Sequence, residues 1–328
     1  MSALFTNTIF FTYLHFLFLI QMWFKNLHIF RFLEPVTISS EELQEKLSQA
    51  AFQPCGKMDM ESIGWVSPLG RENEALVHSA QNCFIFTARK EEKILPASVV
   101  REFVNEKIEE IETQQMRKVR KREKDEIRDE VLFDLIPRAF SRSSYLSAYF
   151  DMTNGWLLVD TPSNKKAEEL ISFLRQTLGS LPVVPLQVQK SPANVMTQWL
   201  VKENDCPADF ELSDACVLTD QEGAVVNCKR QDLLASEIHG HLQAGKLVTR
   251  LALEWDERLG LVLDNDLVIR RLQILDLIEA KINDANAETA IQLFEADFSI
   301  MTSELAILIK KLFKEFGGED EAAYAKMR

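Results

Sequence analysis

The chain lacks the short motifs by which most nucleotide-dependent and metal-dependent enzymes are recognised. Its 328 residues contain no GxxxxGK(S/T) phosphate loop, no GxGxxG turn, no HExxH pair and no GxSxG elbow. His239 and His241 stand two residues apart on a predicted helix, which places them on opposing sides, so they are poorly placed to share a metal ion. P-loop hydrolysis and Rossmann cofactor binding are therefore unsupported, and we expect neither a cofactor nor a metal.

Cysteine is also scarce. The five cysteines are widely spaced and include no CxxC pair. An odd number at wide spacing indicates reduced thiols, as in cytoplasmic proteins, and no disulfide framework. The shares of hydrophobic residues (46%) and charged residues (27%) are typical of a soluble globular protein, and the length suits two domains.

Positive charge is in deficit, because 50 acidic residues against 37 basic ones leave a formal net charge of −13. Taken alone, this deficit argues against a nucleic-acid partner, since proteins that bind polyanions are usually basic. The deficit is uneven, however. Residues 1–150 carry a net charge of −2 and residues 151–328 carry −11, whereas residues 113–145 hold nine basic and six acidic groups. The sequence therefore allows a local basic surface.

Charge is absent altogether from residues 1–24, and residues 9–20 form a strongly apolar run. A signal peptide would need a basic start and a small-residue cleavage site, and neither is visible. A transmembrane helix needs about 20 mainly apolar residues, and polar residues dilute this run. We therefore interpret residues 1–21 as a non-native or disordered extension in front of a start at Met22, and we expect no stable membrane association.

Patterning predicts an α+β fold, with hairpins and helices mixed and no regular βαβ alternation. Strands are expected at 23–32, 83–88, 145–151, 156–160, 183–188, 246–255, 259–263 and 267–274, with a hairpin turn at Thr153-Asn154-Gly155. Helices are expected from a Ser39 cap to about 51, from Pro96 to 136, from a Ser163 cap to 179, over 232–244, and over 275–316 with a break near Asp284.

Domain organisation is indicated by residues 189–209, which are irregular and polar. We place a boundary there, between an N-terminal α+β region (residues 22–190) and a C-terminal α+β region (residues 191–328). The N-terminal region would carry a long basic helical arm at residues 97–136.

The dense part of the basic segment lies on that predicted helix. At about 100° per residue, Arg117, Lys121, Lys124 and Arg128 fall within about 60° of one another, with Arg120 beside them and Lys118 in the same run. Such a stripe would extend roughly 16 Å and could meet several phosphates of duplex DNA. The alternative is a solvated helix laced with i,i+4 ion pairs, which is common in mixed Lys/Glu helices.

A second candidate follows the predicted helix end at Pro137. There the sequence sets Phe140 between Arg138 and Arg142 on a turn. One interpretation has Phe140 in the core and the arginines on the surface. The other has Phe140 stacking or wedging against bases while the arginines hold phosphates. Lys229 and Arg230 are weaker basic candidates in the acidic half.

These segments together resemble one family closely, the recombination-associated protein RdgC of bacteria. The resemblance spans residues 22 to about 318, and its motifs are 22–27 (MWFKNL), 51–56 (AFQPCG), 64–66 (GWV), 89–96 (RKEEKILP), 135–142 (LIPRAFSR), 178–186 (LGSLPVVPL), 245–255 (beginning GKLVT) and 295–305 (beginning EADF). Family chains begin at the equivalent of Met22, so residues 1–21 depart from the pattern.

The resemblance implies a DNA-binding protein without catalytic activity. Family members are thought to bind double-stranded and single-stranded DNA with little sequence preference and to restrain the RecA recombinase by occupying DNA. The implied subunit is elongated and multi-lobed and closes as a ring-shaped homodimer around duplex DNA, in the cytoplasm and associated with the nucleoid. A ring can be acidic outside and basic inside, so the net charge of −13 says little about its bore.

Two other functions stay open from the residues alone. Scattered carboxylates could form the site of a metal-dependent nuclease, although no motif selects them. Residues 1–20 could instead tether a protein-interaction module to a membrane, with the charged helix as its docking arm.

Overall fold

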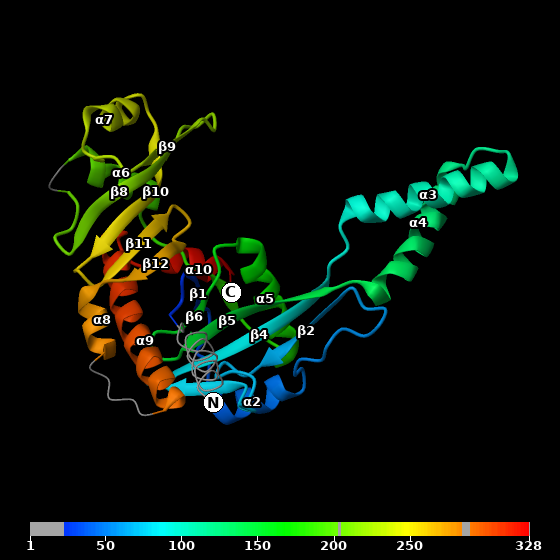
Figure 1. Cartoon of the computed structure of the whole chain (residues 1–328). Coiled ribbons are helices and arrows are strands. Elements are labelled where there is room, and N and C mark those ends of the chain that lie inside the picture. Colours follow the sequence, from blue (N-terminus) through cyan, green and yellow to red (C-terminus); the bar gives the residue numbers. More distant parts are fainter. Residues whose placement is uncertain (1–22, 203–204, 284–288, 328) are drawn as a thin grey trace, which may run out of the picture.

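Two antiparallel sheets, with helices packed on them, confirm the α+β class in a computed structural model of the chain (Figure 1). The structure describes residues 23–202, 205–283 and 289–327. The interpretation of residues 1–21 lies outside the described residues. Within them, no helix is both long and apolar enough to cross a membrane.

The first sheet has seven strands in the order β2-β4-β5-β6-β1-β7, with β3 also paired to β4. The strands are β1 (His28–Phe32), β2 (Glu61–Val66), β3 (Val77–Ala80), β4 (Cys83–Lys93), β5 (Ser141–Asp151), β6 (Trp156–Val159) and β7 (Val183–Pro185). Helices α2 (Ser40–Ser48) and α5 (Asn164–Leu178) bury apolar residues in one core with this sheet. Ser39 and Ser163 cap them as predicted, each accepting a hydrogen bond from a first-turn amide.

The second sheet has the order β12-β11-β10-β8-β9. Its strands are β8 (Phe210–Thr219), β9 (Val225–Lys229), β10 (Leu247–Trp255), β11 (Leu259–Asp264) and β12 (Ile269–Ile274). Helix α6 (Pro192–Val201) contacts β10, and α7 (Ser236–Gln243) contacts α6. The C-terminal helices are α8 (Asp276–Asn283), α9 (Ala290–Glu315) and α10 (Glu321–Met327).

Helix α9 joins the two sheets in one hydrophobic core. Phe298 on α9 meets the Tyr149 ring of β5 edge-on, with ring centroids 5.8 Å apart, and Phe313 meets Trp156 of β6 in the same way at 5.4 Å. A short bridge reinforces the junction, because the amide of Leu27 donates to the carbonyl of Ile269 at 2.7 Å. Strong apolar contact therefore fixes the two sheets relative to each other.

An arm made of two helices projects away from the sheets (Figure 1). Helix α3 (Ala97–Gln115) runs outward, a loop of residues 116–120 reverses the chain, and α4 (Lys121–Leu135) returns to the short 3-10 helix η1 (Ile136–Arg138). The single helix predicted over 96–136 is therefore wrong. The arm has a small core of its own, formed by Val100, Val119, Ile127 and Val131 with apolar neighbours.

Of the other sequence predictions, some are confirmed and some are wrong. The hairpin at Thr153-Asn154-Gly155 is confirmed: it joins β5 to β6, and Gly155 has a φ of 72°. The helical break near Asp284 is confirmed in that α8 ends at Asn283 and α9 begins at Ala290. The prediction that residues 189–209 are irregular is wrong, because α6 occupies much of this segment and buries Val195, Met196, Trp199 and Leu200. The domain boundary placed there stays a prediction.

Candidate nucleic-acid interface

The predicted basic stripe is divided between a loop and a helix. Arg117, Lys118 and Arg120 lie in the loop that joins α3 to α4, whereas Lys121, Lys124 and Arg128 lie on α4. The last three are spaced by three and four residues, so they share one exposed face of α4. The structure thus brings five of the six predicted residues together at one end of the arm, with Arg128 farther along α4, and it does not align them along a single helix.

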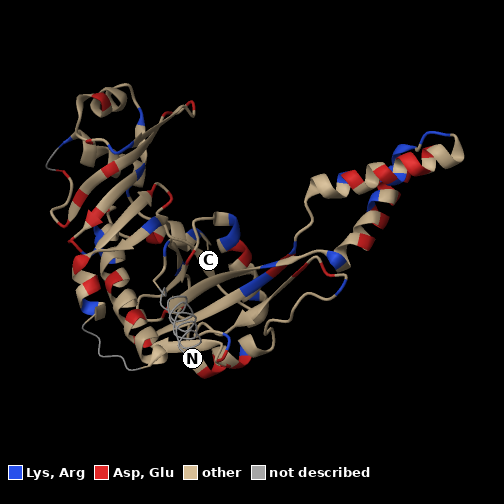
Figure 2. Ribbon diagram, in the orientation of Figure 1, with Lys and Arg blue, Asp and Glu red and all other residues tan. Residues whose placement is uncertain are grey.

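Basic residues are concentrated at the far end of the arm. Residues 117–124 hold six Lys or Arg and one Glu, whereas residues 97–116 and 125–135 together hold three basic and ten acidic residues. Figure 2 shows the joining loop in blue and the two helices largely in red and tan. We call the six basic residues of 117–124 the tip cluster. It includes Arg122, which the candidate set from the sequence omits.

The loop that carries the tip cluster is held in place by buried contacts. Met116 adopts the left-handed conformation (φ 53°, ψ 30°) and ends α3. Val119 turns inward and is only 7% exposed, in the core of the arm. Its amide donates to Oε1 of Glu112 at 2.9 Å, which ties the loop back to α3. The loop is therefore a defined turn that directs its charged side chains outward.

Two members of the tip cluster are in ion pairs. Both terminal nitrogens of Arg117 donate to the carboxylate of Glu123, and Nε of Arg122 lies 3.3 Å from Oε1 of Glu126. The hydrogen bond from Arg117 lowers the pKa of Glu123, and the same bond raises the pKa of the Arg117 guanidinium. Lys118, Arg120, Lys121 and Lys124 have no ion pair with any residue that the structure describes, so their charges are available to a polyanion.

The second candidate lies where the arm returns to the sheet. Arg138 ends η1, Phe140 follows it, and Arg142 lies on β5. The Phe140 side chain is 86% exposed, so its interpretation as a core residue is wrong. The backbone holds it in position, since the Phe140 carbonyl accepts a hydrogen bond from the Ile94 amide at 2.7 Å. Stacking or wedging of Phe140 against bases stays a prediction.

Arg142 belongs to a short chain of alternating charges on the sheet. Its Nη2 lies 3.7 Å from Glu92, which also pairs with Lys90, and Lys90 pairs with Glu61. The hydrogen bond from Lys90 is the main reason that the pKa of Glu92 is lowered, and Arg142 adds to it. Arg142 is therefore partly neutralised, while Arg138 has no ion pair within the described part of the chain.

Lys229 and Arg230 lie far from the arm. Lys229 ends β9, and Arg230 follows it with a φ of 53°. Arg230 borders an open hollow of about 600 Å³ that it shares with Asp214 and Asp232. In Figure 1 the β9 end and the arm stand at opposite sides of the subunit, so one subunit does not bring these cations together with the tip cluster.

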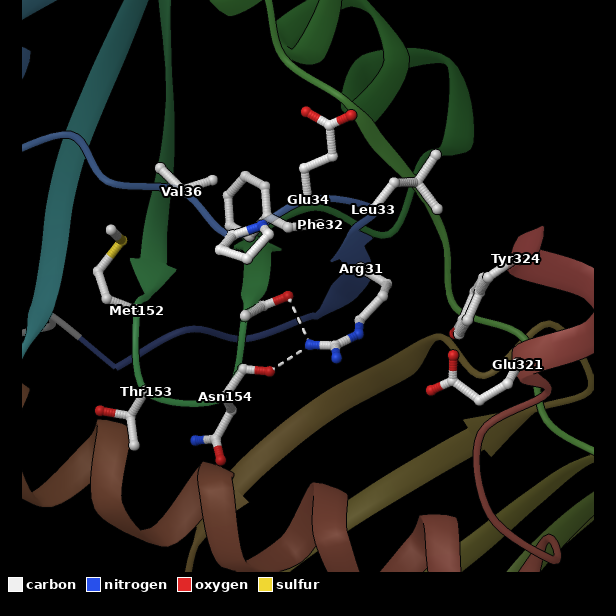
Figure 3. Close-up of a pocket in the computed structure, with 12 residues that line it drawn as sticks. Arg31, Phe32, Leu33, Glu34, Val36, Met152, Thr153, Asn154, Glu321 and Tyr324 are labelled. Carbon is white, nitrogen blue, oxygen red and sulfur yellow. Dashed lines mark hydrogen bonds between the residues drawn. The ribbon is translucent and has the colours of Figure 1, made fainter. Parts of the chain in front are cut away.

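A further cavity of about 320 Å³ lies between the β5–β6 hairpin and α10 (Figure 3). Nη1 of Arg31 donates to the carbonyls of Asn154 and Gly155 at 2.5 and 3.2 Å, and its Nε lies 3.1 Å from Glu319. Burial raises the pKa of Tyr324 to about 12 and also raises the pKa of Glu319. These bonds secure the C-terminal residues to the first sheet and leave Arg31 little capacity for a ligand.

Metal-ligating residues do not gather anywhere in the described ranges: no group of three or more His, Cys, Asp or Glu is placed to hold an ion. His239 and His241 both lie on α7. At the end of β11, the buried Asp264 carboxylate pairs with Arg270 at 2.8 Å, so a protein cation already neutralises it.

Fold and site together define an acidic α+β protein that concentrates unpaired cations at the end of a projecting helical arm. The family model described as "Putative exonuclease, RdgC" matches residues 22–319, and the chain belongs to the RdgC family. Proteins named "Recombination-associated protein RdgC" from Yersinia pestis (strain Pestoides F), Yersinia pseudotuberculosis (strain YPIII) and Yersinia enterocolitica (strain NCTC 13174 / 8081) are each 45% identical over 301 residues. The alignments cover 91% of this chain and 99% of each relative.

Proposed function

We propose that this member of a recombination-associated family binds DNA without sequence preference and uses the tip cluster to hold phosphates. The observation that carries the proposal is the presence of six basic residues within residues 117–124, at the end of an arm that is otherwise acidic. Contacts from lysine and arginine to phosphate oxygens carry no sequence information, so binding through such contacts has no sequence code.

The proposed DNA surface extends from the tip cluster to Arg128 on α4 and to the arm base. There, Arg138 and Arg142 would contact phosphates and the exposed Phe140 would stack on bases of single-stranded or distorted DNA. Lys229 and Arg230 would contact DNA only if a second subunit or a bend of the duplex brought it to them. The acidic remainder of the subunit would repel DNA and so confine it to these cations.

The proposed assembly is a homodimer closed into a ring, with duplex DNA passing through it. A protein of elongated shape with cations far out on an arm can enclose DNA when two copies meet by twofold symmetry. Occupied DNA would then be withheld from RecA, which gives a link to recombination without enzymatic activity. The compartment that follows is the cytoplasm, at the nucleoid.

Encirclement is tested by comparing the retention of the protein on circular and on linear DNA. The wild type is bound to a closed circular plasmid and to the same plasmid after linearisation, and both are challenged with about 1 M salt, which screens phosphate contacts beyond about 3 Å. A ring stays on the circle and leaves the linear form through its ends. Equal loss from both forms contradicts encirclement, and a monomeric mass of the free protein contradicts the dimer.

RecA restraint is tested on single-stranded DNA. DNA coated with the wild type should slow the DNA-dependent ATP hydrolysis of added RecA. A variant that binds DNA weakly should slow it correspondingly less. Equal inhibition by both proteins would contradict exclusion from DNA as the mechanism.

The family description also carries the word exonuclease, so cleavage needs its own assay. End-labelled linear duplex and single-stranded DNA are incubated with the wild type and Mg²⁺ or Mn²⁺. Our proposal predicts intact label at protein concentrations that saturate binding. Release of labelled nucleotides that co-purifies with the protein through gel filtration would establish the enzymatic alternative.

A further inference from the structure

Met116 is the most exposed apolar side chain of residues 116–120, the loop between α3 and α4, which we call the tip loop. It is 92% exposed, the highest value of any large hydrophobic residue that the structure describes. Basic residues follow it immediately, at Arg117, Lys118 and Arg120. An isolated exposed methionine is unremarkable on a protein surface, but here it stands in the midst of cations placed to approach a polyanion.

The backbone at Met116 favours a different residue. A left-handed residue that ends a helix is usually glycine, sometimes asparagine, because a Cβ is unfavourable there. Met116 adopts this conformation with φ 53° and ψ 30° while keeping a long side chain that contacts no core. Folding of the loop therefore gives no reason for a methionine at this position.

Several contacts also hold the tip loop rigid, so that it would resist a force from bound DNA. Val119 anchors it in the arm core, Glu112 accepts its amide, and Arg117 is fixed between Gln115 and Glu123. A rigid support is what a side chain needs if it is to push into a stacked duplex, because a loose loop would yield first.

We propose that Met116 is an apolar wedge which the tip loop inserts between base steps from the minor groove of duplex DNA. The inference rests on the DNA binding proposed above and adds a distortion of the duplex to it. Methionine is among the apolar side chains that partly unstack a base step in this way, and flanking cations hold the adjacent phosphates. Its unbranched thioether is long and adaptable, which suits insertion at many sequences.

The test measures unwinding of the duplex, because a side chain inserted between base pairs changes the twist of DNA wherever the protein binds. Relaxed plasmid is incubated with the protein and topoisomerase I, deproteinised, and its topoisomers are counted. The wild type should shift the linking number in proportion to the amount bound. Met116→Gly should bind DNA with an affinity within about twofold of the wild type but should abolish the shift in linking number. The loop still folds in this variant, because glycine adopts the left-handed conformation without the unfavourable Cβ. Met116→Leu should retain the shift.

Control variants separate the two proposals. Met327→Ala changes a half-exposed methionine on α10, away from the arm, and should unwind DNA like the wild type. A wild type that does not bind plasmid overturns both DNA binding and the wedge. A wild type that binds without a shift, or a Met116→Gly protein that still shifts the linking number, overturns the wedge alone. If Met116→Gly instead changes the mass of the free protein, Met116 contacts a second copy and the wedge is likewise overturned.

Discussion

Arg117 and Glu123 are joined by two hydrogen bonds across the turn of the arm, Nη1 to Oε2 at 2.7 Å and Nη2 to Oε1 at 2.6 Å. The pair links the loop to the first turn of α4, in addition to the anchor that the buried Val119 gives the loop. It also neutralises one of the six tip cations. The same residue thus braces the loop and is withheld from phosphate.

Removing the acidic partner should release that cation. We expect Glu123→Gln to bind duplex DNA more tightly and to steepen the plot of log K against log salt by about one unit, the increment of one phosphate contact. Titrations at several salt concentrations measure both quantities. The matched control is Glu130→Gln, which breaks an exposed pair with Lys107 in the middle of the arm. An equal gain in both variants would show an effect of net charge alone.

Low pH should have the same effect as Glu123→Gln, because protonation removes the charge of the Glu123 carboxylate. Because Arg117 lowers the pKa of Glu123 below its ordinary 4.5, the ion pair is fully present above the ordinary pKa and is lost as pH falls through the lowered value. The difference in DNA affinity between the wild type and Glu123→Gln should therefore be constant near pH 7 and should shrink as the pH falls below the ordinary 4.5 and Glu123 takes up a proton. Affinity titrations from pH 7 to pH 3.5 check this, provided that circular dichroism shows folded protein throughout. A difference that stays constant over the whole range contradicts the role of the pair.

Val119 should determine the order of the arm without affecting the sheets. Val119→Ala removes apolar volume worth about 1.5 kcal/mol at ~0.8 kcal/mol per methylene, from a core that belongs to the arm alone. Hydrogen exchange measured by mass spectrometry should then quicken in α3 and α4 and stay unchanged in β4 and β5. Val99→Ala removes the same atoms from an exposed position of α3 and should leave exchange unaltered. Uniform quickening across the chain would contradict an independent arm core.

Gly64 should tolerate no side chain. A Cβ there would lie 2.3 Å from the Cα of Phe52, whose backbone is held by hydrogen bonding to Trp65 at 2.9 Å. We expect Gly64→Ala to destabilise the protein by about 1–3 kcal/mol through overpacking. Gly240→Ala, in α7 with nothing within 4 Å, should be neutral or stabilising by up to about 1 kcal/mol. Denaturant unfolding of the two variants makes the comparison, and equal stabilities would contradict it.

Local signals in the sequence predicted much of the fold. Asn154-Gly155 specifies a turn by its own backbone preferences, and β10 alternates because one face is buried. The helix α6 also had a signal, since Val195, Met196, Trp199 and Leu200 recur at helical spacing behind a polar start. Its proline and the polar residues around it favour irregular structure, and the sequence-based prediction followed them and not the helical spacing of the apolar residues.

The turn of the arm could not be predicted in the same way. Residues around Met116 are good helix formers, so local propensity favours a continuous helix. What breaks the helix is tertiary: Val119, a lone apolar residue in a basic run, is buried against Ile127 and Val131 only if the chain reverses. The sequence therefore identified the basic residues, but their gathering at an exposed end required the fold.

The salt dependence of DNA binding by a tip variant tests the central claim most directly. Lys118, Arg120, Lys121 and Lys124 are replaced together by alanine, and duplex affinity is measured from low to moderate salt. Our account predicts at least a tenfold loss of affinity and a slope shallower by about 3.6, at ~0.9 for each of the four phosphate contacts. A charge-matched variant at Lys165, Lys166, Lys202 and Lys314 should keep the wild-type slope. Equal slopes for the wild type and the tip variant would contradict DNA binding by the tip cluster.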